Sequence, residues 1–176
     1  MWHTPSLNEF YAIIETIAYN PEVQAMSHVK QHVDGVTRLD HSVFVAYLSF
    51  LICRKVGLDF EAAARAGLLH DLDPQDWRDS GELSLWQHLR RHPRTCMENA
   101  MSHGLSELEQ DIILKHMWPM NLTSLPRHRE SYVVNIADKI CSTAEFFRFI
   151  KFMKAYKRLE AMIFEFLEQV PVPDAV

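Results

Sequence analysis

The chain has 176 residues, 48% of them hydrophobic and 23% charged, which is typical of a single soluble globular domain with a substantial core. Its net charge of −5 argues against a polynucleotide partner, because proteins that bind nucleic acids usually carry a basic surface. The chain has only five glycines and no run of alternating β-branched residues, which favours an all-α fold over a sheet.

The first predicted helices lie between residues 6 and 33. Ser6 and Glu9 form a capping-box pattern before an amphipathic run, and Asn20-Pro21 begins a second helix. His28 and His32 would then share one helix face, a spacing that can bind a metal. No acidic or third ligand accompanies them, so we interpret them as part of an exposed polar face.

A second capping-box pattern, Thr37 with Asp40, precedes a stretch from Val43 to Cys53 that is apolar almost all round. This stretch is too short to cross a membrane, so it predicts the central buried helix of the domain, which ends at Gly57. His41 lies one turn inside this helix, with Arg38 one turn earlier on the same face. A histidine buried there needs a partner, and a metal ion is one of the few candidates.

The next predicted helix, from Phe60 to His70, is capped by Asp59 and contains small residues that allow close helix approach. It ends on the pair His70-Asp71, just before Asp73-Pro74. A metal-binding nitrogen and carboxylate at adjacent positions cannot both point into a core, so we expect them at the rim of a pocket. The polar connection from 73 to 81 is a candidate lid.

Further along, Ser84 is expected to cap a short helix to Arg91, and His92-Pro93 to open another that runs to Gly104. Ser106 and Glu109 predict a capped helix that reaches His116 and ends at Trp118-Pro119. A helix from about Glu130 places Asp138 in an apolar segment, where a carboxylate is costly to bury unless it is paired or binds a metal. The tail from 146 to 170 predicts amphipathic helices with a cationic face.

The potential ligands recur at intervals of roughly one helix plus a turn: His41, His70-Asp71, His92, His116 and Asp138. Successive helices of a bundle could therefore each deliver a ligand to one internal site. The three cysteines, Cys53, Cys96 and Cys141, are widely spaced, which suits buried free thiols in a reducing compartment. The first five residues have neither a basic start nor an apolar signal core, so we expect a cytoplasmic protein without a membrane partner.

These residues in order resemble the HD-domain metal-dependent phosphohydrolase superfamily over residues 35–147. The resemblance rests on His41, His70-Asp71 and Asp138, in the contexts Arg38-x-x-His41-Ser42, Ala66-Gly67-Leu68-Leu69-His70-Asp71 and Ala137-Asp138-Lys139. His92 and His116 further resemble the two-metal branch, which includes diadenosine-tetraphosphate hydrolase-like proteins. The resemblance implies one all-α helical domain over residues 1–176, with N-terminal helices (6–33) and C-terminal helices (148–170) packed on the motif core.

By this resemblance, one metal would be held by His41, His70, Asp71 and Asp138. A second would be held by His92 and His116, with Asp71 bridging the two. These donors suit Fe, Mn, Co, Ni or Zn, and permit Mg. The implied reaction is hydrolysis of a phosphate ester or anhydride, in a nucleotide or other small phosphorylated metabolite, by a metal-bound water or hydroxide.

Arg38 and Lys139 are the candidates for contacts to the substrate phosphate, with surface ion pairs as the alternative role. Some HD families carry an acidic proton donor shortly after the His-Asp pair. Asp73 or Asp76 would take that role here, although the run Leu72-Asp73-Pro74-Gln75-Asp76 departs from those relatives.

Two other functions fit the same residues. The six ligands would equally serve a di-iron HD-type oxygenase, and a sensor module could bind a nucleotide without turning it over. The complete ligand set argues against the sensor, because a pure binding module has no need of it. Trp77, Trp86 and Trp118 could stack on a base, although a core role is the commoner one. The sequence leaves a homodimer open.

Overall fold

The computed structural model describes residues 4–31, 35–75, 84–147 and 161. Within these ranges the regular structure is helical, and strand-like pairing is limited to one bridge between Lys30 and Thr37. The predicted all-α fold is therefore confirmed. The elements are α1 (Thr4–Ala18), α2 (Pro21–Ala25), η1 (Met26–His28), α3 (Arg38–Val56), α4 (Phe60–Leu69), α6 (Leu85–Ala100), η2 (Met101–His103), α7 (Glu107–Lys115) and α8 (Arg129–Phe146).

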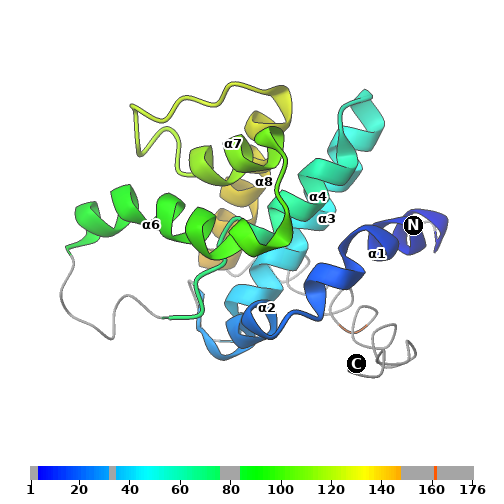
Figure 1. Cartoon of the computed structure of the whole chain (residues 1–176), viewed down its shortest axis with the longest axis horizontal. Helices are drawn as coiled ribbons and strands as arrows, with labels where there is room; N and C mark the ends of the chain where they lie inside the picture. Colours follow the sequence, from blue (N-terminus) through cyan, green and yellow to red (C-terminus); the bar gives the residue numbers. More distant parts are fainter. Residues whose placement is uncertain (1–3, 32–34, 76–83, 148–160, 162–176) are drawn as a thin grey trace.

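Helix α3 is the central helix, as its apolar sequence predicts, and α4 and α8 pack against it (Figure 1). The capping box predicted at its start is present: the Thr37 amide donates to the Asp40 carboxylate, and the Asp40 amide donates to the Thr37 hydroxyl. Gly57 ends the helix with a φ of 72°, a conformation that glycine adopts without steric cost.

Helix α4 approaches α3 closely because Gly67 has no side chain. A Cβ atom at this position would lie 2.8 Å from the Ala46 Cα atom, so only glycine fits. The approach brings the end of α4 towards the start of α3, and the rings of His70 and His41 lie 5.4 Å apart between centroids. The small residues predicted to allow helix contact thus place two potential ligands together.

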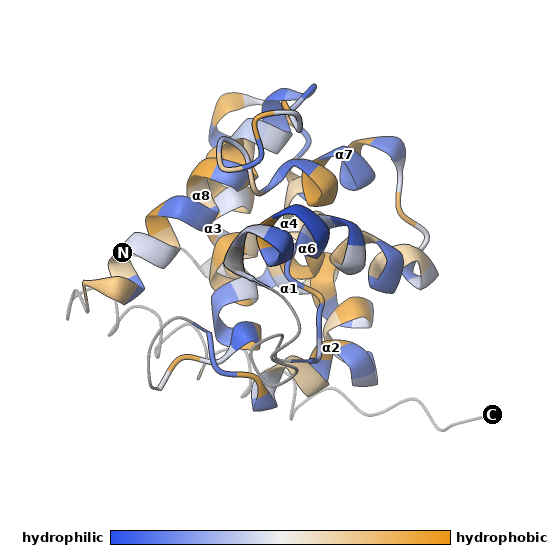
Figure 2. Ribbon diagram, turned by 90° about the vertical axis from the view of Figure 1, so that its left-hand side faces the viewer, coloured by the Kyte–Doolittle hydropathy of each residue, from blue (hydrophilic) through white to orange (hydrophobic). Residues whose placement is uncertain are grey.

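Helix α1 covers the other part of the core through an aromatic cluster. The Phe10 ring lies 5.0 Å from the Tyr47 ring and 5.5 Å from the Phe50 ring, and all three side chains are fully buried. Burying such rings stabilises each by several kcal/mol at about 25 cal/mol per Å² of apolar surface. Figure 2 shows hydrophobic residues where the helices meet and a largely hydrophilic stretch along α6.

The N-terminal helices differ from the prediction. Helix α1 already begins at Thr4, so Ser6 lies inside it rather than at its cap. Helix α2 does begin at Pro21, but it is short, and the chain is extended at Val29 after the η1 turn. A bridge pairs Lys30 of this segment with Thr37, the residue before α3. The helix predicted to reach residue 33 therefore ends early, at His28, and His32 lies outside the described residues.

The segment around His92-Pro93 also differs from the prediction. Ser84 does cap a helix, but α6 runs without interruption from Leu85 to Ala100, with Pro93 inside it. Proline removes one backbone hydrogen bond from a helix interior. The helix continues because Cys96, Met97 and Ala100 beyond the proline are buried in the core.

The remaining helices follow the prediction closely. Ser106 and Glu109 form the predicted capping box of α7, which ends at Lys115, before the predicted Trp118-Pro119 stop. Helix α8 begins at Arg129, next to the predicted Glu130. The predictions for His32, Asp76, Trp77 and the tail from 148 to 170 fall outside the described residues. Among the described helices, none is both long and apolar enough to cross a bilayer.

Candidate metal centre

Five helices bring the six predicted ligands to one buried place. His41 comes from α3, His92 from α6 and Asp138 from α8, while His70 and His116 cap the C-terminal ends of α4 and α7 and Asp71 follows His70. None of the six is more than 8% exposed. The sequence prediction that each helix delivers a side chain to one internal site therefore agrees with the positions of these residues.

The Asp71 carboxylate lies at the centre of the group. Its Oδ1 atom is 2.7 Å from His92 Nε2, 3.7 Å from His116 Nε2 and 3.8 Å from His70 Nε2. This one oxygen therefore lies near histidines from three elements: the end of α4, α6 and the end of α7. Asp71 is therefore a shared neighbour of these three histidines.

The other carboxylate, Asp138, faces the remaining histidine. Its Oδ1 atom lies 3.2 Å from His41 Nε2 and 3.9 Å from His70 Nε2. Two groups of side chains have ligand atoms close enough together to hold an ion. They are His41 with His70 and Asp138, and Asp71 with His92 and Cys96.

The ring orientation of two histidines is fixed by a hydrogen bond between Nδ1 and a backbone carbonyl. His70 Nδ1 lies 2.7 Å from the Gly67 carbonyl, and His116 Nδ1 lies 2.7 Å from the Ile113 carbonyl. The Nδ1–H groups donate there, which leaves both Nε2 atoms with a lone pair directed at the centre. Within the described part of the chain, both buried Nε2 atoms lack a hydrogen-bond partner. Buried polar atoms rarely stay without a partner, so these two lone pairs fit the coordination of a cation at the centre.

The electrostatics fit the same arrangement. Burial lowers the pKa of His70, and burial together with the neighbouring histidines lowers the pKa of His116 to about 3, so both stay neutral. Burial would lower the pKa of His41 as well, but Glu145 and Asp138 outweigh it and raise the pKa to about 10. Burial acts to raise the pKa of Asp71, but the surrounding histidines hold it well below its usual value. The neutral imidazoles of His70 and His116 and the ionised carboxylate of Asp71 are the protonation states in which these groups can bind a cation.

A comparison with known protein families identifies the pattern. The HD domain family matches residues 38–143, which is more than half of the chain. The chain belongs to the HD domain family. No curated protein and no solved structure matches the chain significantly. Membership suggests metal-dependent phosphohydrolase-type activity, since HD domains bind divalent metals and are mostly metal-dependent hydrolases.

The chain also contains supporting residues that were not predicted from the sequence. Glu145 is fully buried and its Oε1 atom lies 2.7 Å from His41 Nδ1. Gln31 donates from Nε2 to Asp71 Oδ2 at 2.8 Å. Asn135 donates to the His116 carbonyl. Glu145 and Asn135 lie seven residues after and three before Asp138, so helical spacing could have indicated that they share its face.

The two predicted phosphate contacts lie close to the HD centre but have partners within the chain. The Arg38 guanidinium donates to the backbone carbonyls of Asp73 and Gln75 and to Gln31 Oε1, so it fixes the segment after the His-Asp pair. Lys139 Nζ donates to Asp138 Oδ2 at 2.8 Å and to the His116 carbonyl at 2.6 Å. Contact of either residue with substrate stays a prediction.

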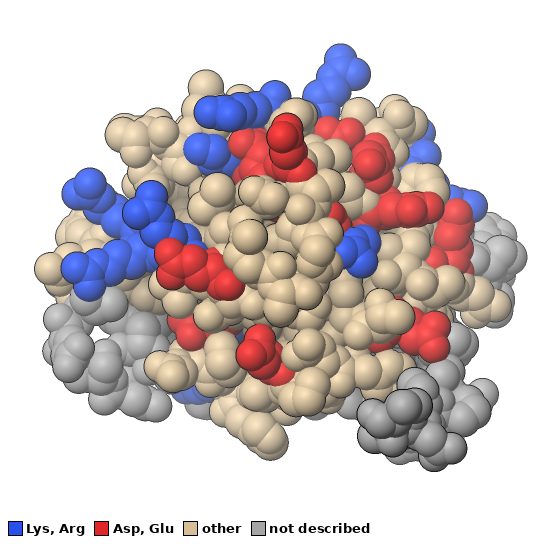
Figure 3. Space-filling model, in the orientation of Figure 1, with Lys and Arg blue, Asp and Glu red and all other residues tan. Residues whose placement is uncertain are grey.

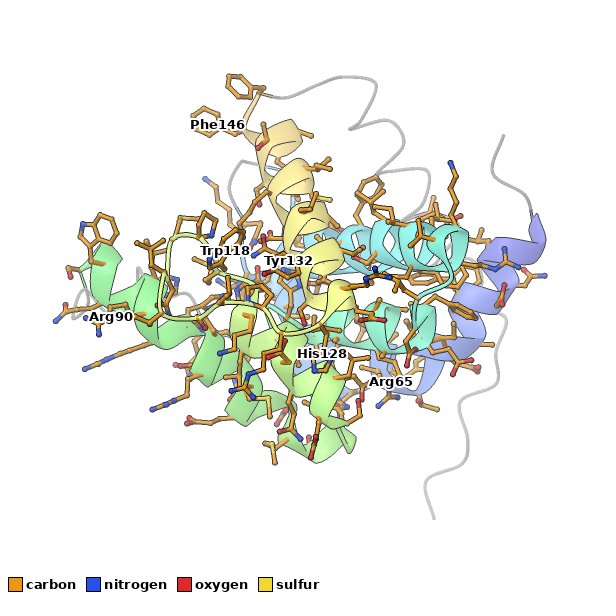
Figure 4. The ribbon with its side chains drawn as sticks, turned by 90° about the horizontal axis from the view of Figure 1, so that it is seen from above. Arg65, Arg90, Trp118, His128, Tyr132 and Phe146 are labelled. Carbon is orange, nitrogen blue, oxygen red and sulfur yellow. The ribbon has the colours of Figure 1, made fainter. Side chains whose placement is uncertain are left out.

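The predicted proton donor Asp73 is only partly buried, and its Oδ1 atom accepts a hydrogen bond from the Gln75 amide. Of the tryptophans that could stack on a base, Trp86 is 70% exposed, and the Trp118 ring packs against Tyr132 (Figure 4). The three cysteines are buried free thiols, as predicted.

Proposed function

We propose that this HD domain is a two-metal phosphohydrolase that cleaves a phosphate ester or anhydride of a nucleotide or another small phosphorylated metabolite. One observation carries the proposal: two buried imidazole nitrogens without a partner, on His70 and His116, both lie within 4 Å of the Asp71 carboxylate. A merely structural histidine would donate or accept at both ring nitrogens.

The donor set fits a pair of divalent ions. His41, His70, Asp71 and Asp138 would hold one ion, and His92 and His116 would hold the other, with Asp71 between them. Imidazole and carboxylate donors suit Fe, Mn, Co, Ni or Zn. The Cys96 thiol is also within reach of the second ion, because its Sγ atom groups with the ligand atoms of Asp71 and His92. A sulfur donor there would favour Zn, Co or Fe over Mg.

When bound, such ions supply Lewis acidity towards a phosphoryl oxygen and a water acidic enough to attack phosphorus near neutral pH. The chain itself orients and balances the site. Gln31 fixes the outer oxygen of Asp71, and Glu145 fixes the ring of His41. Lys139, which is 30% exposed, places a positive charge beside Asp138 where a phosphate would approach. Asp73, two residues beyond Asp71, is our candidate to protonate the leaving oxygen.

An activity screen tests the proposal. The full chain, loaded separately with Mn, Co, Ni or Fe, is incubated with a panel of small phosphorylated metabolites, and released phosphate is measured. We expect metal-dependent release that Asp71→Asn abolishes and that the control His128→Ala, at an exposed position, retains. Oxygen uptake by the iron-loaded protein, or nucleotide binding without turnover, would support the oxygenase or sensor alternatives instead. Absence of phosphate release with every metal and substrate would count against a hydrolase.

We further propose that the substrate is a small molecule rather than a polynucleotide. The net charge of the whole chain is −5, whereas backbone recognition of nucleic acids relies on an extended basic surface.

A further inference from the structure

A cleft of about 590 Å³ lies between α6 and the end of α7 with the loop that follows it. We call it the α6–α7 cleft, and the residues that matter for its chemistry are Arg90, Arg91, Arg94, Lys115, Thr123 and Ser124. In Figure 3, Lys and Arg side chains gather on the side of the molecule where α6 lies in Figure 1. Figure 4 shows Arg90 pointing outward from α6.

The charges that line this cleft are not balanced by neighbours. Three arginines and one lysine face one carboxylate, Glu98, so four positive charges less one leave +3, in a chain whose total is −5. In the ranges that the structure describes, none of these four cations forms an ion pair. Other arginines do: Arg54 pairs with Glu9, and Arg65 pairs with Glu109. A concentrated positive field in a hollow raises the local concentration of anions.

The cleft is separate from the metal centre. Arg91, Arg94 and Glu98 share one face of α6, because they are spaced by three and four residues. His92 and Cys96, which face the metal centre, are buried on a different face of the same helix. None of the six predicted ligands lines the cleft. Whatever binds there therefore does not compete with the metals for side chains.

The size and the side chains select a class of ligand. Small-molecule sites have volumes of about 300–1,000 Å³, and the cleft falls within this range. Arginine guanidinium groups bind phosphate through two parallel hydrogen bonds, and clustered arginines are a recurring means of holding phosphate groups. Thr95, Thr123 and Ser124 line the same space, and their hydroxyl groups donate to the Arg91 carbonyl, the Asn121 side chain and the Leu114 carbonyl. Polynucleotides, by contrast, follow extended basic stripes rather than a single small hollow.

We propose that the α6–α7 cleft is a second binding site, which takes a small molecule carrying two or more linked phosphate groups. Arg91, Arg94 and Lys115 bind the phosphate oxygens, and Arg90 at the end of the cleft adds a fourth charge. The site does not depend on metal, and it stands whether or not the metal centre hydrolyses phosphate.

Calorimetry with inorganic triphosphate tests this site on the full chain after metal removal by dialysis, so that triphosphate has no metal centre to bind. We expect binding that weakens steeply as salt is added. In the double variant Arg91→Glu/Arg94→Glu the affinity should fall about a hundredfold or more, since each of the two lost charge-assisted contacts is worth about tenfold.

The matched control is Arg127→Glu/Arg129→Glu, which changes the total charge equally at two exposed residues outside the cleft. For this control we expect the affinity for triphosphate to fall about threefold at most, because exposed charges at a distance from the ligand are screened by salt. If the glutamate variant does not fold by circular dichroism, Arg94→Gln/Lys115→Gln makes the same test with a smaller change. No binding by the wild type, or equal losses in cleft and control variants, would overturn the proposal.

Discussion

Glu145 lies behind His41 and shows how one ligand depends on its neighbour. Its Oε1 atom lies 2.7 Å from His41 Nδ1, which leaves Nε2 directed towards Asp138. Partners of this kind fix ring orientation, and their loss typically lowers metal affinity by about 10–100-fold. We therefore expect Glu145→Gln to weaken metal binding by about this factor in equilibrium dialysis, while Glu107→Gln, an exposed control, leaves it unchanged. Equal affinity in both variants would make Glu145 a packing residue only.

Cys96 is the residue that distinguishes this centre from one built of histidine and aspartate alone. Its Sγ atom lies 3.6 Å from both ring nitrogens of His92. If the thiol binds the second ion, Co²⁺-loaded protein should show a near-ultraviolet sulfur-to-metal absorption band as well as the visible bands of bound cobalt. Cys96→Ser should lose the ultraviolet band and keep the visible ones, and Cys53→Ser should keep both. Visible bands without an ultraviolet band in the wild type would exclude sulfur coordination while leaving the metal centre intact.

The residues that could be predicted from the sequence were those with unusual chemistry for their position. His41 and Asp138 are polar residues in apolar helical segments, so their burial demanded a partner, and the structure brings them within 3.2 Å. Gln31 and Glu145 gave no such signal, because each is an ordinary residue for a helix or loop surface. Only the tertiary packing of α8 against α3 places Glu145 beside His41.

The contact between helices α3 and α4 determines where His70 lies. A methyl group at position 67 would meet the Ala46 backbone at 2.8 Å, and backbone cannot rotate away as a side chain can. Glycine to alanine in a helix interior normally stabilises by about 0.5–1 kcal/mol. We predict the opposite sign for Gly67→Ala: a loss of about 1–3 kcal/mol in the free energy of unfolding, as for overpacked cores. Denaturant titration measures it, and a stability gain would contradict the close approach.

The starts of α3 and α7 were predictable because a local hydrogen-bond pattern determines them, although the same pattern at Ser6 does not mark the start of α1. The capping boxes at Thr37 and Ser106 are present as predicted, since a cap requires only residues within one turn. The continuity of α6 through Pro93 was not predictable in the same way. Whether a helix tolerates a proline depends on how well the turns beyond it are packed, and Cys96 and Ala100 are fully buried by other helices.

The net charge of the chain was a poor guide to the charge of its local surfaces. The total of −5 correctly describes the chain but hides the positive α6–α7 cleft, because Arg91 and Arg94 come near Lys115 only through folding. A sum over the sequence has no information on which charges become neighbours. A negative total charge disfavours the extended basic surface that binds polynucleotides. It is compatible with a small cleft that binds phosphate.

Metal binding should also appear as stability of the whole chain, because five helices meet at the centre. A ligand that binds only the folded state at 100 times its Kd adds about 2.7 kcal/mol. For a domain of this size, that corresponds to a rise in Tm of roughly 5–10 °C. We expect this rise in calorimetric scans of metal-loaded against chelated protein. His128→Ala should show the same rise, and His70→Ala a much smaller one. An unchanged Tm at saturating metal would argue against a centre that joins these helices.

The metal content of purified variants tests the two-metal centre most directly. Wild-type protein reconstituted with Mn, Co or Fe should hold about two ions per chain, and His92→Ala or His116→Ala about one. Asp71→Ala should hold fewer than either, because it removes the carboxylate that faces both groups of histidines. Circular dichroism checks that each variant is folded. Equal metal content in the wild type, His92→Ala and His116→Ala would contradict the account, because these two histidines would then be structural residues beside a single-ion site.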